Sequence, residues 1–145
     1  MNRNFIFVLI SLVTLFSIVN AITQFKECVE FPDAELLTVK LTPDPIKPGE
    51  QEFEVSVKLN YTITPATIIN FDGIDQVNPK LLASYYMDLC SQTDCPVNTG
   101  TTFSTTHKFT LPAKLPSKYF IRVYHFLVTP GVRAPFSCAI AIVGS

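Results

Sequence analysis

The chain has 145 residues, with 11 Lys or Arg against 12 Asp or Glu, so its formal net charge is −1 with neutral histidines. Because there is no basic surplus, the long-range attraction on which nucleic-acid binding depends is missing, and no polybasic run suggests electrostatic attachment to an anionic membrane. The length fits one domain that buries a core without the help of a metal.

The first 21 residues are expected to be a signal peptide. Arg3 supplies the positive start, residues 5–19 form a mostly apolar run, and Val19-Asn20-Ala21 offers the small or modest residues that signal peptidase prefers. The apolar run is shorter than the roughly 20 residues that a spanning helix needs. We therefore predict an exported protein whose mature domain covers residues 22–145.

The clearest strand pattern runs over residues 53–63, where every odd position is apolar or aromatic and every even position is polar. This period of two is typical of a strand with one buried and one solvated face. Asn60 lies on the solvated face and begins the sequon Asn60-Tyr61-Thr62. We expect Asn60 to carry a glycan, since the protein is expected to be exported.

Other strands are predicted by aromatic and β-branched residues, over 36–41, 103–111, 118–129 and 135–143. The proline-rich stretch 43–49 is a connector, and turns are expected at Asp72-Gly73, Thr99-Gly100 and Pro130-Gly131. Residues 70–89 fit either two strands or one strand with a long loop. Seven or eight short strands without an amphipathic helix predict an all-β sandwich or barrel.

Four cysteines follow the leader, namely Cys28, Cys90, Cys95 and Cys138. An even number in a short exported chain indicates disulfides. The spacing favours one long bridge, Cys28–Cys138, and one local bridge, Cys90–Cys95, although four cysteines allow three connectivities. A bridge that joins the two ends of the mature chain implies a single closed domain.

Catalytic and metal-binding motifs are not found. His107 and His125 each stand alone among apolar or hydroxyl neighbours, and we expect His125 to be packed in the core or exposed rather than catalytic. The cysteines lack the paired two-residue spacings of zinc sites. The acids near expected turns are interpreted as turn caps: Asp72, Asp75, Asp88 and Asp94. The sequence thus favours a protein that is not an enzyme and needs no cofactor or metal.

The segments 120–128 and 81–89 are apolar on both faces of a strand. One explanation is a central strand covered on both sides, or a mixed surface. The other is that some of these side chains face a cavity between two sheets, and we include Phe126 among the candidate lipid contacts on that basis.

Several of these features together resemble the ML lipid-recognition domain family, and most closely its phosphatidylglycerol/phosphatidylinositol transfer protein branch. The matching parts follow the signal peptide and Cys28 in order. They are residues 39–49, the alternating strand from Phe53, Asp88-Leu89-Cys90, Cys95-Pro96-Val97, Phe109-Thr110-Leu111-Pro112, Leu115-Pro116 and Cys138.

The resemblance implies an immunoglobulin-like β-sandwich of two antiparallel sheets with an apolar cavity between them that holds a lipid. It also implies the disulfides Cys28–Cys138 and Cys90–Cys95. Leu111 and Leu115 match positions that line the mouth of the cavity in sterol-binding relatives, and Leu82 matches a third position less closely. Those relatives carry a further cysteine pair in the early proline-rich loop, which is absent here, so the resemblance favours a phospholipid over a sterol.

The function that this resemblance implies is transfer of single phospholipids, phosphatidylglycerol or phosphatidylinositol, by a secreted or endolysosomal monomer in transient contact with membranes. Lys114, Lys118 or Arg122 would help to hold the phosphate. Three alternatives stay open: a sterol carrier, a non-catalytic immunoglobulin-like recognition module with a solid core, and an accessory protein that presents lipids to a hydrolase.

Overall fold

The structure is a computed structural model that describes residues 22–129 and 134–144. The expected signal peptide, residues 1–21, and the expected turn at Pro130-Gly131 lie outside the described residues. In the part of the chain that is described, no helix has the length and apolar character needed to cross a membrane.

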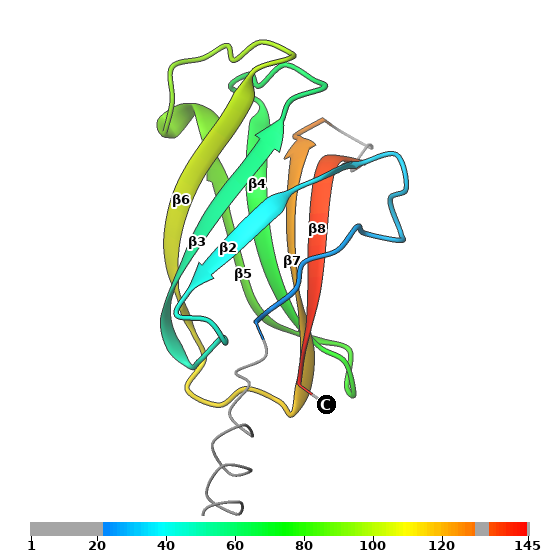
Figure 1. Cartoon of the computed structure of the whole chain (residues 1–145), viewed down its shortest axis with the longest axis vertical. Coiled ribbons are helices and arrows are strands. Elements are labelled where there is room, and N and C mark those ends of the chain that lie inside the picture. Colours follow the sequence, from blue (N-terminus) through cyan, green and yellow to red (C-terminus); the bar gives the residue numbers. More distant parts are fainter. Residues whose placement is uncertain (1–21, 130–133, 145) are drawn as a thin grey trace, which may run out of the picture.

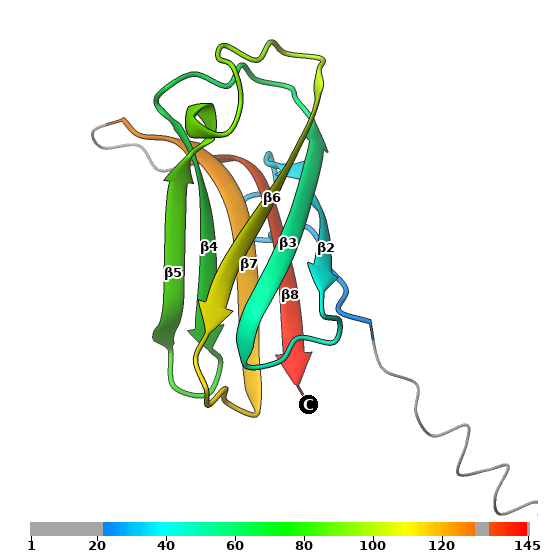
Figure 2. The ribbon, with the colours of Figure 1, turned by 90° about the vertical axis from the view of Figure 1, so that its left-hand side faces the viewer.

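The described residues form two β-sheets that pack face to face (Figures 1 and 2). A five-stranded sheet has the order β1-β8-β7-β4-β5, and a three-stranded sheet has the order β2-β3-β6. Neighbouring strands are antiparallel except β1, which is parallel to β8. The strands are β1 (Glu35–Leu36), β2 (Thr38–Thr42), β3 (Gly49–Lys58), β4 (Thr67–Asp75), β5 (Lys80–Asp88), β6 (Thr102–Leu111), β7 (Lys118–Leu127) and β8 (Pro135–Gly144). The predicted all-β sandwich is confirmed.

The stretch 70–89, which the sequence left open, contains two strands, β4 and β5. The turn expected at Asp72-Gly73 is wrong, because both residues lie inside β4, next to a register shift between Gly73 and Ile74. The chain reverses instead after β4, over residues 76–79. The turn at Thr99-Gly100 is confirmed, and there Gly100 has a φ of +87°, which glycine adopts without strain.

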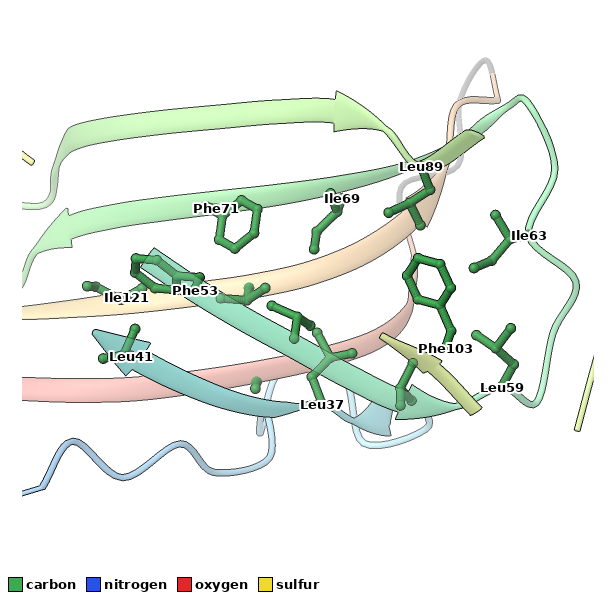
Figure 3. Close-up of a cluster of buried hydrophobic side chains, with 14 of the residues drawn as sticks. Leu37, Leu41, Phe53, Leu59, Ile63, Ile69, Phe71, Leu89, Phe103 and Ile121 are labelled. Atoms are coloured by element: carbon green, nitrogen blue, oxygen red, sulfur yellow. The ribbon is translucent and has the colours of Figure 1, made fainter. Parts of the chain in front are cut away.

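The core lies between the two sheets and is built by the alternation seen in the sequence. In β3 the odd-numbered side chains face inward, and Phe53 and Val55 are fully buried. The buried side chains come from both layers and point toward one another (Figure 3). Phe53 stacks on Phe109 at 4.4 Å between ring centroids and meets the edge of Phe71 at 5.4 Å. Burial of each such side chain stabilises the fold by roughly 1.5–3 kcal/mol.

Both disulfides favoured by the spacing are present, Cys28–Cys138 and Cys90–Cys95. The first fixes the N-terminal segment to β8, and the second closes the loop after β5. That loop begins with a 3₁₀ helix, Leu89–Ser91, whose first turn is capped by Asp88 through a 2.8 Å hydrogen bond from the Cys90 amide. Asp88 therefore caps a turn as expected.

Candidate functional site

The two sheets meet along two long sides, which differ in how they are held. On one side lie β5 and β6, each the edge strand of its sheet. Within the described residues, backbone pairing joins β5 to β4 and β6 to β3, and no pairing joins β5 to β6. We call this side the β5–β6 seam.

Tyr85 bridges the β5–β6 seam. Its hydroxyl donates a hydrogen bond of 2.6 Å to the backbone carbonyl of Thr110, and its ring stacks on Phe109 with centroids 4.7 Å apart. One hydrogen bond contributes about 1 kcal/mol net, and an aromatic pair adds about 0.5–1.5 kcal/mol beyond the area it buries. The side-chain contacts of Tyr85 across the seam therefore contribute only a few kcal/mol.

A surface groove of about 580 Å³ runs along this seam, lined by residues 82–85 of β5 and residues 110–113 of β6 and its end. Beneath it, between the sheets, lies a void of about 10 Å³. The wall of the void includes Phe71, Phe109 and Ile121, and Ala83, Tyr85 and Leu111 line both hollows. The groove and the void are thus separated by the Tyr85 bridge and its neighbours.

Where an open cavity between the sheets was expected, the described residues leave only a small void. A void of about 10 Å³ is far below the roughly 300–1,000 Å³ of ordinary ligand pockets. The rings of Phe53, Phe71 and Phe109 fill the space instead, since an empty apolar cavity forfeits dispersion contacts and lowers stability. A ligand of lipid size therefore requires the sheets to separate.

Two of the four predicted lipid contacts, Leu82 and Leu111, line this seam. Leu82 lines the groove, and Leu111 lines both the groove and the void. Leu115 lies in the connection between β6 and β7 and packs, half-buried, against the core. Phe126 lies elsewhere. It follows the inward-facing His125 in β7 and so points to the outer face of the five-stranded sheet, where its ring lies 5.4 Å from the ring of Tyr124.

The opposite side of the sandwich, which we call the β1–β2 seam, is held more firmly. A single buried residue, Leu37, separates β1 in one sheet from β2 in the other, and its amide donates to the carbonyl of Cys138 at 3.4 Å. The disulfide from Cys138 to Cys28 fixes the segment that leads into β1. Near the start of that segment, the amide and hydroxyl of Thr23 donate to the carboxylate of Asp44, in the connection after β2.

A buried polar cluster also joins the two sheets near the β1–β2 seam. The hydroxyl of Tyr61, just beyond β3, contacts Nδ1 of His125 on β7 and lies 3.1 Å from the hydroxyl of Ser137 on β8. Burial, with a smaller effect from His107, lowers the pKa of His125 to about 3, and burial raises the pKa of Tyr61 to about 12 against a smaller opposing effect of Ser137. Both groups are thus neutral near pH 7, which agrees with the expectation that His125 is packed in the core.

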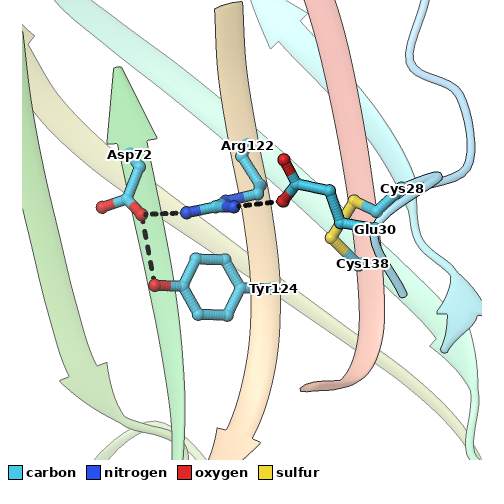
Figure 4. Close-up of a disulfide and its surroundings, with 6 residues drawn as sticks. All are labelled: Cys28, Glu30, Asp72, Arg122, Tyr124 and Cys138. Carbon is cyan, nitrogen blue, oxygen red and sulfur yellow. Dashed lines mark hydrogen bonds and ion pairs between the residues drawn. A yellow bond between two sulfur atoms is a disulfide. The ribbon is translucent and has the colours of Figure 1, made fainter. Parts of the chain in front are cut away.

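The charged residues of the outer face form a structural network (Figure 4). Arg122 pairs with Asp72 at 3.2 Å and with Glu30 at 3.0 Å, and Asp72 also accepts a hydrogen bond from the hydroxyl of Tyr124 at 3.1 Å. The expected roles of two residues change here. Asp72 does not cap a turn, and Arg122 lies on the outer face with its charge already paired, so it is not placed to hold a phosphate at the β5–β6 seam.

Residues that could ligate a metal are dispersed over the described part of the chain. No group of three or more His, Cys, Asp or Glu residues among residues 22–129 and 134–144 is placed to hold a metal ion. His107 is buried against Phe71, and its Nε2 lies 3.1 Å from the hydroxyl of Thr105 on the same strand. Burial lowers the pKa of His107.

The sequence did not predict that Tyr85 and Phe109 close the seam, although Phe109 belongs to one of the stretches that carry the family resemblance. Both lie in segments recognised as rich in apolar or aromatic residues. The sequence signal that could have found them is alternation along the strand. Phe103, His107, Phe109 and Leu111 occupy odd-numbered positions and share one face of β6, and Tyr85 shares a face of β5 with Ala83. Which strands form the facing edges, however, is a property of the topology.

Comparison with known proteins agrees with this architecture. The family model of the ML domain matches residues 23–127. The crystal structure of chicken MD-1 complexed with lipid IVa aligns with a TM-score of 0.52 at 19% identity, over 83% of this chain and 87% of that one. The C-terminal domain of wzt aligns with a TM-score of 0.52 at 15% identity, over 84% of this chain and 77% of that one. No curated protein sequence matches the chain.

Proposed function

Because the chain belongs to the ML domain family, an immunoglobulin-like β-sandwich, we propose that it binds single lipid molecules between its sheets and carries them between membranes. One observation carries this proposal: the β5–β6 seam has a groove above a void and is bridged by Tyr85, whereas the β1–β2 seam is cross-linked. The sandwich is therefore built to open on one side while the other side holds the sheets together.

The energetics favour such an exchange. An acyl chain of ~14 methylenes, at about 0.8 kcal/mol for each methylene buried, gains roughly 11 kcal/mol when it leaves water. Opening the seam forfeits the hydrogen bond and the ring stacking of Tyr85, which together contribute about 1–3 kcal/mol. As the sheets separate, the rings of Phe53, Phe71 and Phe109 exchange their packing on one another for packing on the acyl chain. A hydrocarbon tail is thus a better occupant of the seam than water.

The ligand class that we propose is a glycerophospholipid, phosphatidylglycerol or phosphatidylinositol. The connection over residues 43–49 lacks the cysteine pair of the sterol-binding relatives. Lys114 directly follows the groove residues Pro112 and Ala113, is exposed, and forms no ion pair within the described residues. The phosphate would lie in the groove beside Lys114, with Leu82, Leu111 and Leu115 around the tails.

We further propose that the protein acts without catalysis, as a monomer, outside the cell or in an endolysosomal lumen. Two disulfides fit an oxidising compartment. Cleavage after Ala21 would release the domain. Asn60 is exposed, as a glycan requires, and its amide now donates to Glu35 at 3.0 Å, a bond that a glycan would replace.

Native mass spectrometry and organic extraction of the secreted protein test this function. We expect one bound phospholipid per chain. A bound sterol would support the sterol carrier, and a chain without lipid that also fails to take up phosphatidylglycerol from vesicles would support the recognition module and overturn the proposal.

A pair of variants localises the site. Ala83→Trp fills the void and the groove floor and is expected to abolish lipid uptake. Thr106→Trp, on an exposed position of β6, is the matched control and should take up lipid normally. Equal uptake by both variants would place the lipid elsewhere.

A further inference from the structure

One end of the sandwich gathers features that are scattered in the sequence. This end, which we call the groove end, contains the β2–β3, β4–β5 and β6–β7 connections and the end of β8, which lie together in Figure 1. The groove along the β5–β6 seam reaches it through Pro112 and Ala113.

At the groove end, a row of apolar residues runs across four neighbouring strands of the five-stranded sheet, β5, β4, β7 and β8. Leu81 of β5 pairs with Ile74 of β4, Ile74 pairs with Phe120 of β7, and Phe120 pairs with Ile142 of β8. Leu81 is 54% exposed and Ile142 is 60% exposed, while Val77 in the adjacent β4–β5 connection is 68% exposed. Ile74 and Phe120, between the two exposed ends of the row, are half-buried. Apolar side chains exposed next to one another mark an interaction surface.

Lysines surround this apolar row. Lys80 begins β5, Lys118 begins β7, and Lys114 lies in the connection between β6 and β7. All three are exposed, and none forms an ion pair with another residue in the ranges that the structure describes. Lys47, in the β2–β3 connection, is also exposed and unpaired in those ranges.

The carboxylates of the groove end, three in number, offset only part of the charge of its four lysines. Asp44 is held by Thr23, and Asp75 accepts hydrogen bonds from the amides of Val77 and Asn78. Glu50 lies 3.9 Å from Lys108. At the other end of the sandwich, residues 59–66 and 89–101 contain Asp94 and no Lys or Arg. The charge on the groove end is therefore positive in excess.

From this arrangement we infer that the groove end is a docking surface for a bilayer that contains anionic lipids. Leu81, Ile142 and Val77 lie among the headgroups, and Lys80, Lys114 and Lys118 contact lipid phosphates. This inference rests on the proposed function, because it places the β5–β6 groove against the membrane from which a lipid is taken. Dispersed lysines and a cross-strand row explain why the sequence shows no polybasic run.

The contribution of the lysines to docking can be tested in a flotation assay on the full secreted protein. The vesicles consist of phosphatidylcholine, with or without 30% phosphatidylglycerol. A lysine near an anionic surface contributes about 1 kcal/mol, which is about fivefold in affinity. The triple variant Lys80→Gln, Lys114→Gln, Lys118→Gln should lose on the order of 100-fold in binding to the anionic vesicles. The control, Lys26→Gln, Lys40→Gln, Lys58→Gln, removes three lysines outside the connections of the groove end, of which Lys40 is paired with Glu54, and should bind like the wild type.

The apolar row is tested separately, with Leu81→Gln and Ile142→Gln. Both positions are exposed, so the fold should be retained, and binding should fall at 0.5 M salt, where charges are screened, as well as at low salt. Three results would overturn the docking surface. The protein could bind both kinds of vesicle equally, the two triple variants could lose binding equally, or the protein could be a dimer in solution that Leu81→Gln and Ile142→Gln dissociate. A wild type that carries lipid but ignores anionic vesicles would overturn this inference alone, whereas one that docks but never carries lipid would overturn the proposed function.

Discussion

The two seams of the sandwich contrast in what joins the sheets. At the β1–β2 seam, a one-residue crossover at Leu37, the nearby Cys28–Cys138 bridge and the buried Tyr61–His125–Ser137 cluster hold the layers together. At the β5–β6 seam, one tyrosine makes a hydrogen bond and a ring contact across two unpaired strand edges. The β1–β2 seam therefore has more cross-links between the layers than the β5–β6 seam, which is where the proposed function requires the sheets to separate.

The largest expected effect concerns the bridge of the β1–β2 seam. Cys28 and Cys138 are 110 residues apart, and a loop of about this length stabilises by up to about 4.7 kcal/mol in the chain-entropy model. The double substitution Cys28→Ser, Cys138→Ser should lower the free energy of unfolding by that order. The matched control is Cys90→Ser, Cys95→Ser, whose five-residue separation predicts about 2 kcal/mol. Urea denaturation measures the free energy of unfolding of both double variants. Equal losses in the two would contradict the claim that the long bridge stabilises the fold more than the short one.

The second effect comes from His125 in the cluster near the same seam. Its folded pKa of about 3 lies below the ordinary 6.5, so the unfolded chain takes up the proton first as the pH falls. The stabilisation is complete above about pH 6.5 and is lost at about 1.4 kcal/mol per pH unit down to about pH 3. Between pH 7 and pH 5 the loss is about 2 kcal/mol.

His125→Gln keeps a polar group but removes this titration, so its unfolding free energy should vary less with pH. The residual slope would include His107, whose pKa burial also lowers. An unchanged pH dependence in this variant would show that the cluster does not hold a neutral histidine against protonation.

The smallest effect on stability, and the most informative about function, is expected at Tyr85. Tyr85→Phe removes one hydrogen bond from a half-exposed side chain and should cost about 1 kcal/mol or less. Transfer of a fluorescent phospholipid between vesicles should become several-fold faster, because the seam opens more readily. Tyr61→Phe is the control at the other seam: it should cost more stability, since it leaves His125 without its partner, and should leave the transfer rate unchanged.

The sequence was sufficient for the parts of the molecule that depend on local periodicity. Alternation over residues 53–63 predicted the inward face of β3, and spacing favoured both disulfides that the structure contains. The pattern extended beyond β3. Leu59 to Ile63 keep their alternating burial, but their backbone pairs only through Leu59 with residues 100–101 and through an isolated bridge between Ile63 and Val97. Alternation reports which side chains are buried and not where backbone pairing ends.

Which strands lie next to one another could not be predicted from the sequence. That β5 and β6 form the facing edges, and that Tyr85 joins them, follows from strand order. Asp72 was expected in a turn because Asp-Gly commonly forms one, but the hydrogen bonds from Arg122, Tyr124 and Ser84 favour its place in β4. The closed interior was also unexpected, since composition does not reveal whether aromatic rings surround a cavity or fill it.

The claim that a lipid lies between the sheets at the β5–β6 seam is tested most directly by fluorescence quenching. The chain contains no tryptophan, so Phe109→Trp and Tyr86→Trp each introduce a single reporter. Residue 109 faces the void, and residue 86 is 74% exposed on the outer face. A phospholipid with brominated acyl chains should strongly quench Trp at 109 and leave Trp at 86 nearly unaffected. Equal quenching at both positions, or none at 109 in protein shown to carry the lipid, would contradict the account.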